Sequence, residues 1–229
     1  MNFLKSILLM AVLSFSSENF HAQDWANLKR YQNENAELMK QNSNEKRIVF
    51  MGNSITESWI SNRPGFFKGK PYVNRGIGGQ TTPQMLLRFK QDVIDLKPYA
   101  VVILAGINDI AGNTGPITIE ETFQNIVAMT EMATSNGIKV ILCSVLPAKD
   151  FPWRPGLEPA EKVVKLNALL KKYVDNNNLV YVDYFFEMND GSNGLRENLG
   201  YDGVHPNALG YSIMEPLVEE GIAKVFRHK

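Results

Sequence analysis

The sequence predicts an α/β protein: a three-layer α/β/α sandwich around a five-stranded parallel sheet, flavodoxin-like in its strand order. Short apolar segments rich in β-branched residues alternate with longer segments whose apolar residues recur at helical spacing. Two of the short segments contain VVIL and VILCSVL, which are apolar on both faces and typical of strands covered on both sides. This alternation favours parallel strands joined by right-handed crossovers, and we expect the strand order 2-1-3-4-5.

The expected elements follow one another without an internal repeat, a low-complexity tract or a linker, so we expect a single domain, 23–229. Local signals support the element bounds: Pro83 suits a first helical turn, and Asn136 with Gly137 suits a helix end. The expected strands lie at 47–52, 71–76, 99–106, 139–147 and 179–185. The expected helices lie at 83–96, 118–135, 159–176 and 207–226, with an added N-terminal helix at 24–42.

Residues 1–22 have the pattern of a secretory signal peptide. Lys5 precedes an unbroken apolar run at 7–13, far shorter than a membrane-spanning helix, and Ala22 is a small residue suited to cleavage. The alternative is a retained anchor or a buried helix. A lipid anchor would need a cysteine just after the run, and the one cysteine of the chain is Cys143. We therefore expect export, to the periplasm or the cell exterior, and no membrane span.

The composition excludes several classes of partner. The formal net charge is zero, so the chain lacks the basic field that nucleic acid or an anionic membrane would require. A single cysteine excludes an internal disulfide, and its apolar neighbours indicate a buried position. The oligomeric state cannot be read from the sequence.

Four expected strands are followed by loops with residues capable of chemistry. Ser54 follows the first strand in GNSIT, Gly79 the second in GIGGQTT, and Asn108 the third in GINDI. Asp202 and His205 follow the fifth strand in YDGVHP. Taken singly, each loop has an ordinary explanation as a helix cap, a glycine turn or a polar loop. In open parallel sheets, however, ligands bind at the carboxyl ends of the strands, where these loops meet.

In order and spacing, the four blocks resemble those of the SGNH (GDSL-type) hydrolase family, and the resemblance extends over 46–226. It implies that Ser54 is the nucleophile, His205 the base and Asp202 the carboxylate that orients the base. It also implies an oxyanion hole formed by the backbone N–H groups of Ser54 and Gly79 and by the side chain of Asn108. The implied activity is ester hydrolysis through a covalent acyl-enzyme.

The family contains esterases, lysophospholipases, thioesterases and carbohydrate deacetylases, and the resemblance is greatest to its acetylhydrolase-like members. This chain has Asn53 where the namesake motif of the family has aspartate. That position is not catalytic in the family, so the departure does not affect the implied chemistry.

Elimination leads to the same histidine. His21 would leave with the signal peptide, and His228 is the penultimate residue. His205 therefore remains as the histidine able to act as a base near neutral pH, which a serine nucleophile needs. Asp202 lies three residues earlier, close enough across one turn to orient its imidazole.

Other site classes fit the sequence less well. The sequence GNSIT lacks the second glycine of the G-x-S-x-G elbow of α/β-hydrolases. One usable histidine and no cysteine cluster cannot build a zinc site, so we expect no metal and no cofactor. A non-catalytic flavodoxin-like binding module stays an alternative, although GNSITESW has a single glycine and no basic residue to hold a phosphate.

The substrate is less well defined than the chemistry. Phe151, Trp153 and Arg154 follow the fourth strand in a proline-rich loop that should border the site. Trp153 either stacks on a sugar ring or pins the loop to the core, and the sequence favours neither. We expect a short acyl group, acetyl above all, carried by a small-molecule or carbohydrate ester. A lysophospholipase or thioesterase with the same residues is the alternative.

Overall fold

The computed structural model describes residues 24–41 and 45–227, so the expected signal peptide lies outside the described part of the chain. Five strands form one parallel sheet in the order β2-β1-β3-β4-β5, which confirms the expected fold class and strand order. The strands are β1 (Ile48–Gly52), β2 (Tyr72–Gly76), β3 (Ala100–Leu104), β4 (Lys139–Cys143) and β5 (Val180–Val182).

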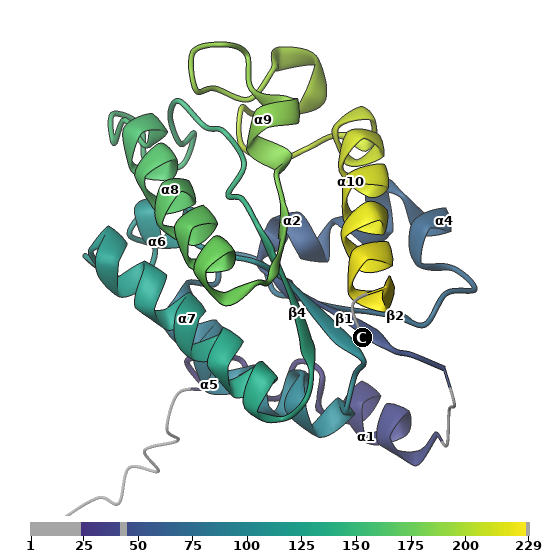
Figure 1. Ribbon diagram of the computed structural model, residues 1–229. Coiled ribbons are helices and arrows are strands. Elements are labelled where there is room, and N and C mark those ends of the chain that lie inside the picture. The colour runs from purple at the N-terminus through teal and green to yellow at the C-terminus, as the bar shows by residue number, and fades with distance from the viewer. Residues whose placement is uncertain (1–23, 42–44, 228–229) are drawn as a thin grey trace, which may run out of the picture.

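Helices cover both faces of the sheet (Figure 1). The crossovers α5 (Thr82–Asp92), α7 (Ile119–Ser135) and α8 (Ala160–Asn177) pack side by side on one face. The C-terminal helix α10 (Ala208–Arg227) packs on the other face, together with the short helices between β1 and β2. The short helices are α2 (Ser54–Glu57), α3 (Trp59–Asn62), α4 (Pro64–Phe67), α6 (Ile107–Ile110) and α9 (Tyr184–Met188), with 3₁₀ turns at Ile94–Leu96 and Glu197–Leu199.

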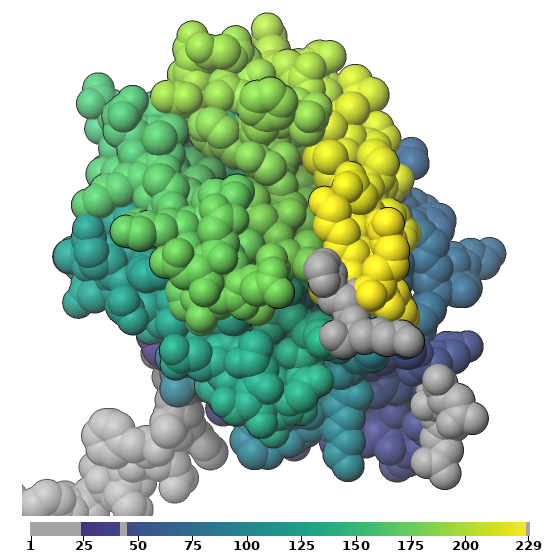
Figure 2. All heavy atoms as spheres, in the orientation of Figure 1, coloured from purple at the N-terminus to yellow at the C-terminus, as the bar shows by residue number. Residues whose placement is uncertain are grey.

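The core is formed by the strands and the apolar faces of these helices. Every residue of β1 and β3 is buried, because a parallel sheet between two helix layers has no solvated face. The space-filling view shows that side chains close the spaces between the ribbons on the face it presents (Figure 2). An aromatic cluster holds the short helices against β1, with neighbouring ring centroids 5.0–6.2 Å apart. Its members are Phe50, Trp59, Phe66, Phe67 and Tyr72.

The N-terminal helix is shorter than expected, because α1 spans only Gln32–Lys40 within the expected range of 24–42. The preceding residues form turns instead. The Asp24 carboxylate accepts the N–H groups of Leu28 and Lys29 at 2.7 and 3.1 Å. Asn27 has a φ of 53°, in the left-handed region, which a helix interior does not permit.

The strands end at the same level, so the loops that follow them converge. Gly52 of β1 pairs with Gly76 of β2 on one side and with Leu104 of β3 on the other. The three loops that begin there carry the first three sequence blocks. Helices α2 and α9 lie at this edge, and both are drawn above the strand labels in Figure 1.

Candidate active site

Ser54 follows the tight turn between β1 and α2. A Cβ at Gly52 would lie 2.1 Å from Thr56 Oγ1, so the turn depends on glycine. Asn53 is the N-cap of α2, and its Oδ1 accepts the N–H of Ile55 at 3.1 Å. Aspartate and asparagine cap helices equally well, which explains how Asn53 can occupy this position. Ser54 is therefore the first helical residue, and its hydroxyl is not needed as a cap.

In the structure, the histidine predicted from the sequence lies within hydrogen-bond distance of both the predicted serine and the predicted aspartate. Ser54 Oγ is 3.0 Å from His205 Nε2, although the two residues are 151 positions apart. His205 Nδ1 is 2.8 Å from Asp202 Oδ2. The other carboxylate oxygen, Oδ1, accepts the backbone N–H groups of His205 and Val204 at 2.8 and 3.0 Å. These bonds fix the imidazole between the carboxylate and the hydroxyl.

The surroundings of Asp202 keep its carboxyl group ionised. Burial alone would raise its pKa, but hydrogen bonds from the His205 backbone and ring and from the Val204 N–H outweigh burial, and the pKa lies below the ordinary value. The side chains of Asp202 and His205 are about one-third exposed, so solvent can reach the pair. An ionised carboxylate in this position stabilises an imidazolium and selects the tautomer with a free Nε2.

Gly79 and Asn108 lie on adjacent loops after β2 and β3. Gly79 has a φ of 74°, where glycine is favoured. The Asn108 side chain is 3% exposed, and its Nδ2 donates to the Gln80 carbonyl oxygen at 3.0 Å. A side-chain amide carries two donor hydrogens, so one remains for a ligand after this bond has fixed the side chain. Asn113 Nδ2 donates to the Gly79 carbonyl oxygen at 3.1 Å, which gives the loop after β2 a second hydrogen bond to the segment after β3.

Asp109, next to Asn108, ties the third loop to the start of α5. Both of its carboxylate oxygens lie 3.0 Å from the Thr82 nitrogen, and Oδ1 accepts the Thr82 hydroxyl at 2.5 Å. Burial raises the pKa of Asp109 to about 6, with the Thr82 hydrogen bonds acting in the opposite direction. The sequence gives no signal for this role of Asp109, because its partner Thr82 lies 27 positions away.

Trp153 lies beside the histidine. Its ring centroid is 5.7 Å from that of His205, and its Nε1 donates to Asn113 Oδ1 at 3.2 Å. Trp153 is 39% exposed, so part of its ring faces solvent next to the reacting groups. Asn113 therefore joins Trp153 to the Gly79 loop, a role for which the sequence gives no signal beyond a polar side chain in a loop.

The other two candidate substrate residues hold Trp153 and its loop in place. Phe151 is fully buried, and its ring lies 5.1 Å from that of Trp153. Arg154 Nη1 donates to the carbonyl oxygens of Ala111 and Gly112 at 2.6 and 2.7 Å, which pins this loop to the loop after β3. Trp153 is thus the member of this trio that presents a surface beside His205.

A serine, a histidine and a carboxylate joined in this order at the carboxyl edge of a parallel sheet form the arrangement of a serine hydrolase. The model of the GDSL-like lipase/acylhydrolase family matches residues 50–213. The chain belongs to this family and is a hydrolase. Within the described residues, no group of three or more His, Cys, Asp and Glu side chains is placed to hold a metal ion.

Known proteins of several kinds are similar to this chain. A crystal structure of a Bacteroides fragilis protein assigned as an acylhydrolase is 51% identical, with a TM-score of 0.86 over 90% of this chain and 100% of that one. The acetylxylan esterase of Geobacillus stearothermophilus is 25% identical over 210 residues, 77% of this chain and 93% of its own length. An uncharacterised lipoprotein of Bacillus subtilis is 42% identical over 78 residues, 33% of this chain and only 32% of its own length.

Proposed function

We propose that this chain is a serine esterase that hydrolyses short-chain acyl esters, acetyl esters above all, on carbohydrate substrates. The observation that carries the proposal is the hydrogen-bonded series Ser54, His205 and Asp202, with distances of 3.0 and 2.8 Å, at the carboxyl edge of the sheet. A serine hydroxyl becomes an effective nucleophile only beside a base held in this way.

The proposed reaction has two halves. Ser54 Oγ attacks the acyl carbonyl carbon while His205 Nε2 takes the hydroxyl proton, and Asp202 stabilises the imidazolium that results. The tetrahedral oxyanion is held by the N–H groups of Ser54 and Gly79 and by the Asn108 amide. His205 returns the proton to the departing alkoxide, which leaves an acyl group on Ser54. His205 then takes a proton from a water molecule, which attacks the acyl carbonyl carbon, and returns that proton to Ser54 Oγ as the bond to the acyl group breaks and the acid leaves.

Two observations support a small acyl group on a sugar. The acetylxylan esterase relative aligns over most of both chains. Trp153 exposes part of its ring beside His205, and aromatic rings are flat apolar surfaces against which a sugar ring packs.

Hydrolysis of p-nitrophenyl acetate by the wild type and by Ser54→Ala tests the esterase proposal. We expect kcat to fall by several orders of magnitude in the variant, with an unchanged circular dichroism spectrum. A variant that keeps more than about a tenth of the wild-type kcat, after contaminating esterases are excluded, would overturn the assignment of Ser54. Acetate release from acetylated xylan and from lysophospholipids then compares the substrate classes.

We also propose that residues 1–22 direct export and that 23–229 form the mature domain. The charged start and apolar run of the sequence support this. No helix among the described residues is long and apolar enough to cross a membrane. Expression of the whole chain in a bacterial host, followed by N-terminal sequencing of the exported protein, should give a chain that begins at Gln23. An intact Met1 on exported protein would contradict the cleavage.

A further inference from the structure

Glu57 joins the helix of the proposed nucleophile to the loop of the proposed oxyanion hole. It is the last residue of α2, three positions after Ser54, and its Oε2 accepts the Gly78 N–H at 2.8 Å. A Cβ placed on Gly78 would lie 3.0 Å from this oxygen and 4.0 Å from Ser54 Cβ. The carboxylate and the nucleophile therefore flank the same short stretch of backbone.

That stretch needs support, because two consecutive glycines have wide conformational freedom. The structure holds it at three successive points. Glu57 takes the Gly78 N–H, Asn113 donates to the Gly79 carbonyl oxygen, and Asn108 donates to the Gln80 carbonyl oxygen. Asn113 and Asn108 both lie in the segment between β3 and α7, so Glu57 is the support that comes from the helix of the proposed nucleophile.

We propose that Glu57 is a positioning residue for the oxyanion hole, an inference that rests on the esterase function proposed above. By accepting the Gly78 N–H, Glu57 turns that peptide toward α2 and fixes the orientation in which the next N–H, that of Gly79, meets the substrate oxygen. An oxyanion hole accelerates a reaction because its donors are oriented before the charge develops. Glu57 stabilises the transition state through Gly79 and does not contact the substrate.

The N-terminal segment supplies the counter-charge that this arrangement requires. A carboxylate close to the site would repel a developing oxyanion, and Arg30 Nη2 lies 3.7 Å from Glu57 Oε1. The guanidinium carbon of Arg30 lies 4.7 Å from the centroid of the Tyr31 ring, and the Tyr31 hydroxyl donates to the carbonyl oxygen of Gly76 at 2.5 Å. The Arg30–Glu57 pair is partly exposed, so it contributes little to stability, and its role is to balance charge.

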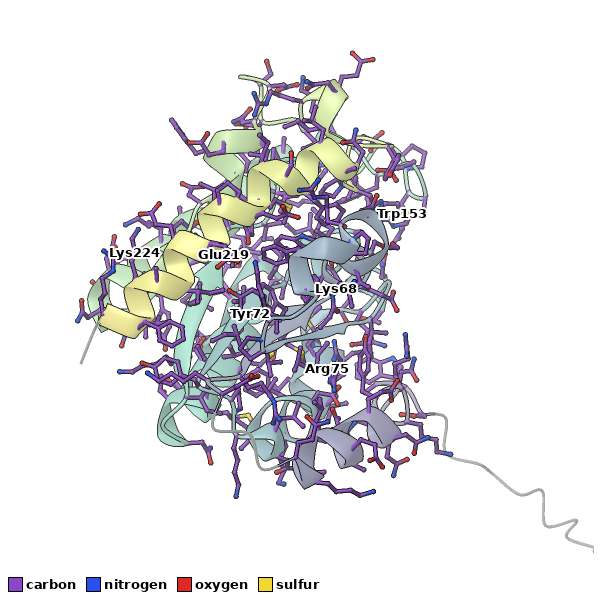
Figure 3. All side chains as sticks on the ribbon, turned by 90° about the vertical axis from the view of Figure 1, so that its right-hand side faces the viewer. Lys68, Tyr72, Arg75, Trp153, Glu219 and Lys224 are labelled. Atoms are coloured by element: carbon purple, nitrogen blue, oxygen red, sulfur yellow. The ribbon has the colours of Figure 1, made fainter. Side chains whose placement is uncertain are left out.

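The test compares Glu57→Ala and Glu57→Gln with a matched control, Glu219→Ala. Glu219 is exposed to nearly the same extent as Glu57 (38% against 36%), pairs with Lys70 and accepts the Tyr72 hydroxyl. It lies on α10 beside Tyr72, well away from Trp153 at the site (Figure 3). Kinetics on p-nitrophenyl acetate give kcat and KM separately, and thermal denaturation gives Tm.

We expect Glu57→Ala to lower kcat by about 10- to 100-fold with little change in KM, since misplacement of a donor costs transition-state stabilisation. Glu57→Gln should recover most of this loss, because its amide oxygen can still accept the Gly78 N–H. Glu219→Ala should lower Tm by as much as Glu57→Ala and leave kcat unchanged.

Equal kcat values for the wild type and Glu57→Ala would overturn the inference, and so would a loss that Glu57→Gln does not relieve. A loss of kcat in Glu219→Ala as large as that in Glu57→Ala would also overturn it, because it would show a general effect of destabilisation. A wild type without Ser54-dependent esterase activity would instead overturn the proposed function.

Discussion

Asp109, which follows the proposed oxyanion donor Asn108 in the sequence, is a buried ionisable residue whose effect on stability can be measured. Burial raises its pKa from 3.8 to about 6, so the folded protein binds a proton at this carboxyl more tightly than the unfolded chain does. The stability gained from this preference is fully present below about pH 3.8 and is lost as the pH rises through 6.

Asp109→Asn should remove this pH dependence. Between pH 4 and pH 7, we expect the free energy of unfolding of the wild type to fall by about 2–3 kcal/mol relative to that of the variant. Urea denaturation of both proteins across this range measures the difference. The comparison uses the slope of the free energy of unfolding against pH and not its absolute value. The absolute value also changes in Asp109→Asn, because the amide alters the hydrogen bonds to Thr82. Parallel curves for the two proteins would show that Asp109 does not titrate there.

Asp190 provides the control for this experiment. Its pKa is lowered to about 2, chiefly by the hydrogen bond from Lys149. A lowered pKa contributes stability above about pH 3.8 that is lost as the pH falls toward 2, which is the opposite sign in a different range. Asp190→Asn should therefore leave the slope between pH 4 and pH 7 unchanged.

Single residues differ in how far the sequence could predict them. Ser54 and His205 could be predicted because each lies in a motif after a strand, and because the other histidines lie at the chain ends. Glu57 and Asn113 could not be predicted, since each acts on the backbone of a loop that only the fold brings near. The burial of Phe151 could not be predicted either. Phe151 and Trp153 are aromatic residues of the same loop, but only the structure shows that Phe151 is fully buried and that Trp153 is partly exposed.

At the scale of elements, the seating of α2 on β2 depends on Gly76. A Cβ at Gly76 would lie 2.1 Å from the Glu57 nitrogen and 2.7 Å from the Thr56 carbonyl carbon. Because both are backbone atoms, the helix itself would have to move. We expect Gly76→Ala to destabilise the protein by about 1–3 kcal/mol or more, and to lower kcat because α2 carries Ser54.

Gly65→Ala is the matched control for this substitution. Gly65 lies in α4, and no atom comes within 4 Å of a Cβ placed there. Alanine at such a position should be neutral or slightly stabilising, because it restricts the unfolded chain. Thermal denaturation of both variants, with kcat measured on p-nitrophenyl acetate, provides the comparison. Equal Tm values for the two would mean that α2 adjusts without cost.

The long elements could be predicted and the short ones could not. Strands such as β3 and β4 have apolar runs that no loop would carry, and helices such as α7 and α8 are long enough to show their periodicity. Helices of four or five residues, such as α2 and α6, contain little more than one turn and give no periodic signal. The start of α1 could not be predicted, because the turn held by Asp24 and the left-handed conformation of Asn27 are local features that periodicity does not detect.

At the scale of the whole molecule, the site exists because the strands end together. Ser54 and His205 are 151 residues apart, and their contact follows from the parallel order of the sheet rather than from any local preference. The sequence could therefore predict that the two would meet, once the strands and their order were recognised. The depth of the site depends on how the surrounding loops fold, which the sequence does not specify.

We expect those loops to offer little apolar surface to a long acyl chain. Phe66 and Phe67, the apolar pair of α4, belong to the aromatic cluster on Phe50. The loop that carries Trp153 is pinned by Arg154 to the loop after β3. A long acyl chain gains about 0.8 kcal/mol for each CH₂ that it buries, so a site that buries few CH₂ groups has no means of favouring a long chain.

The preference of the enzyme for acyl chains of a given length therefore depends on several loops together, and it can be measured directly. With p-nitrophenyl esters from acetate to decanoate, we expect kcat/KM to be greatest for the shortest chains and to fall beyond butyrate. Trp153→Ala, which opens the side of the site next to His205, should weaken the discrimination against longer chains without abolishing hydrolysis. A maximum at octanoate or longer in the wild type would reject the short-chain assignment and favour a lysophospholipase or thioesterase, because only a groove formed by movement of these loops could then supply the apolar contact.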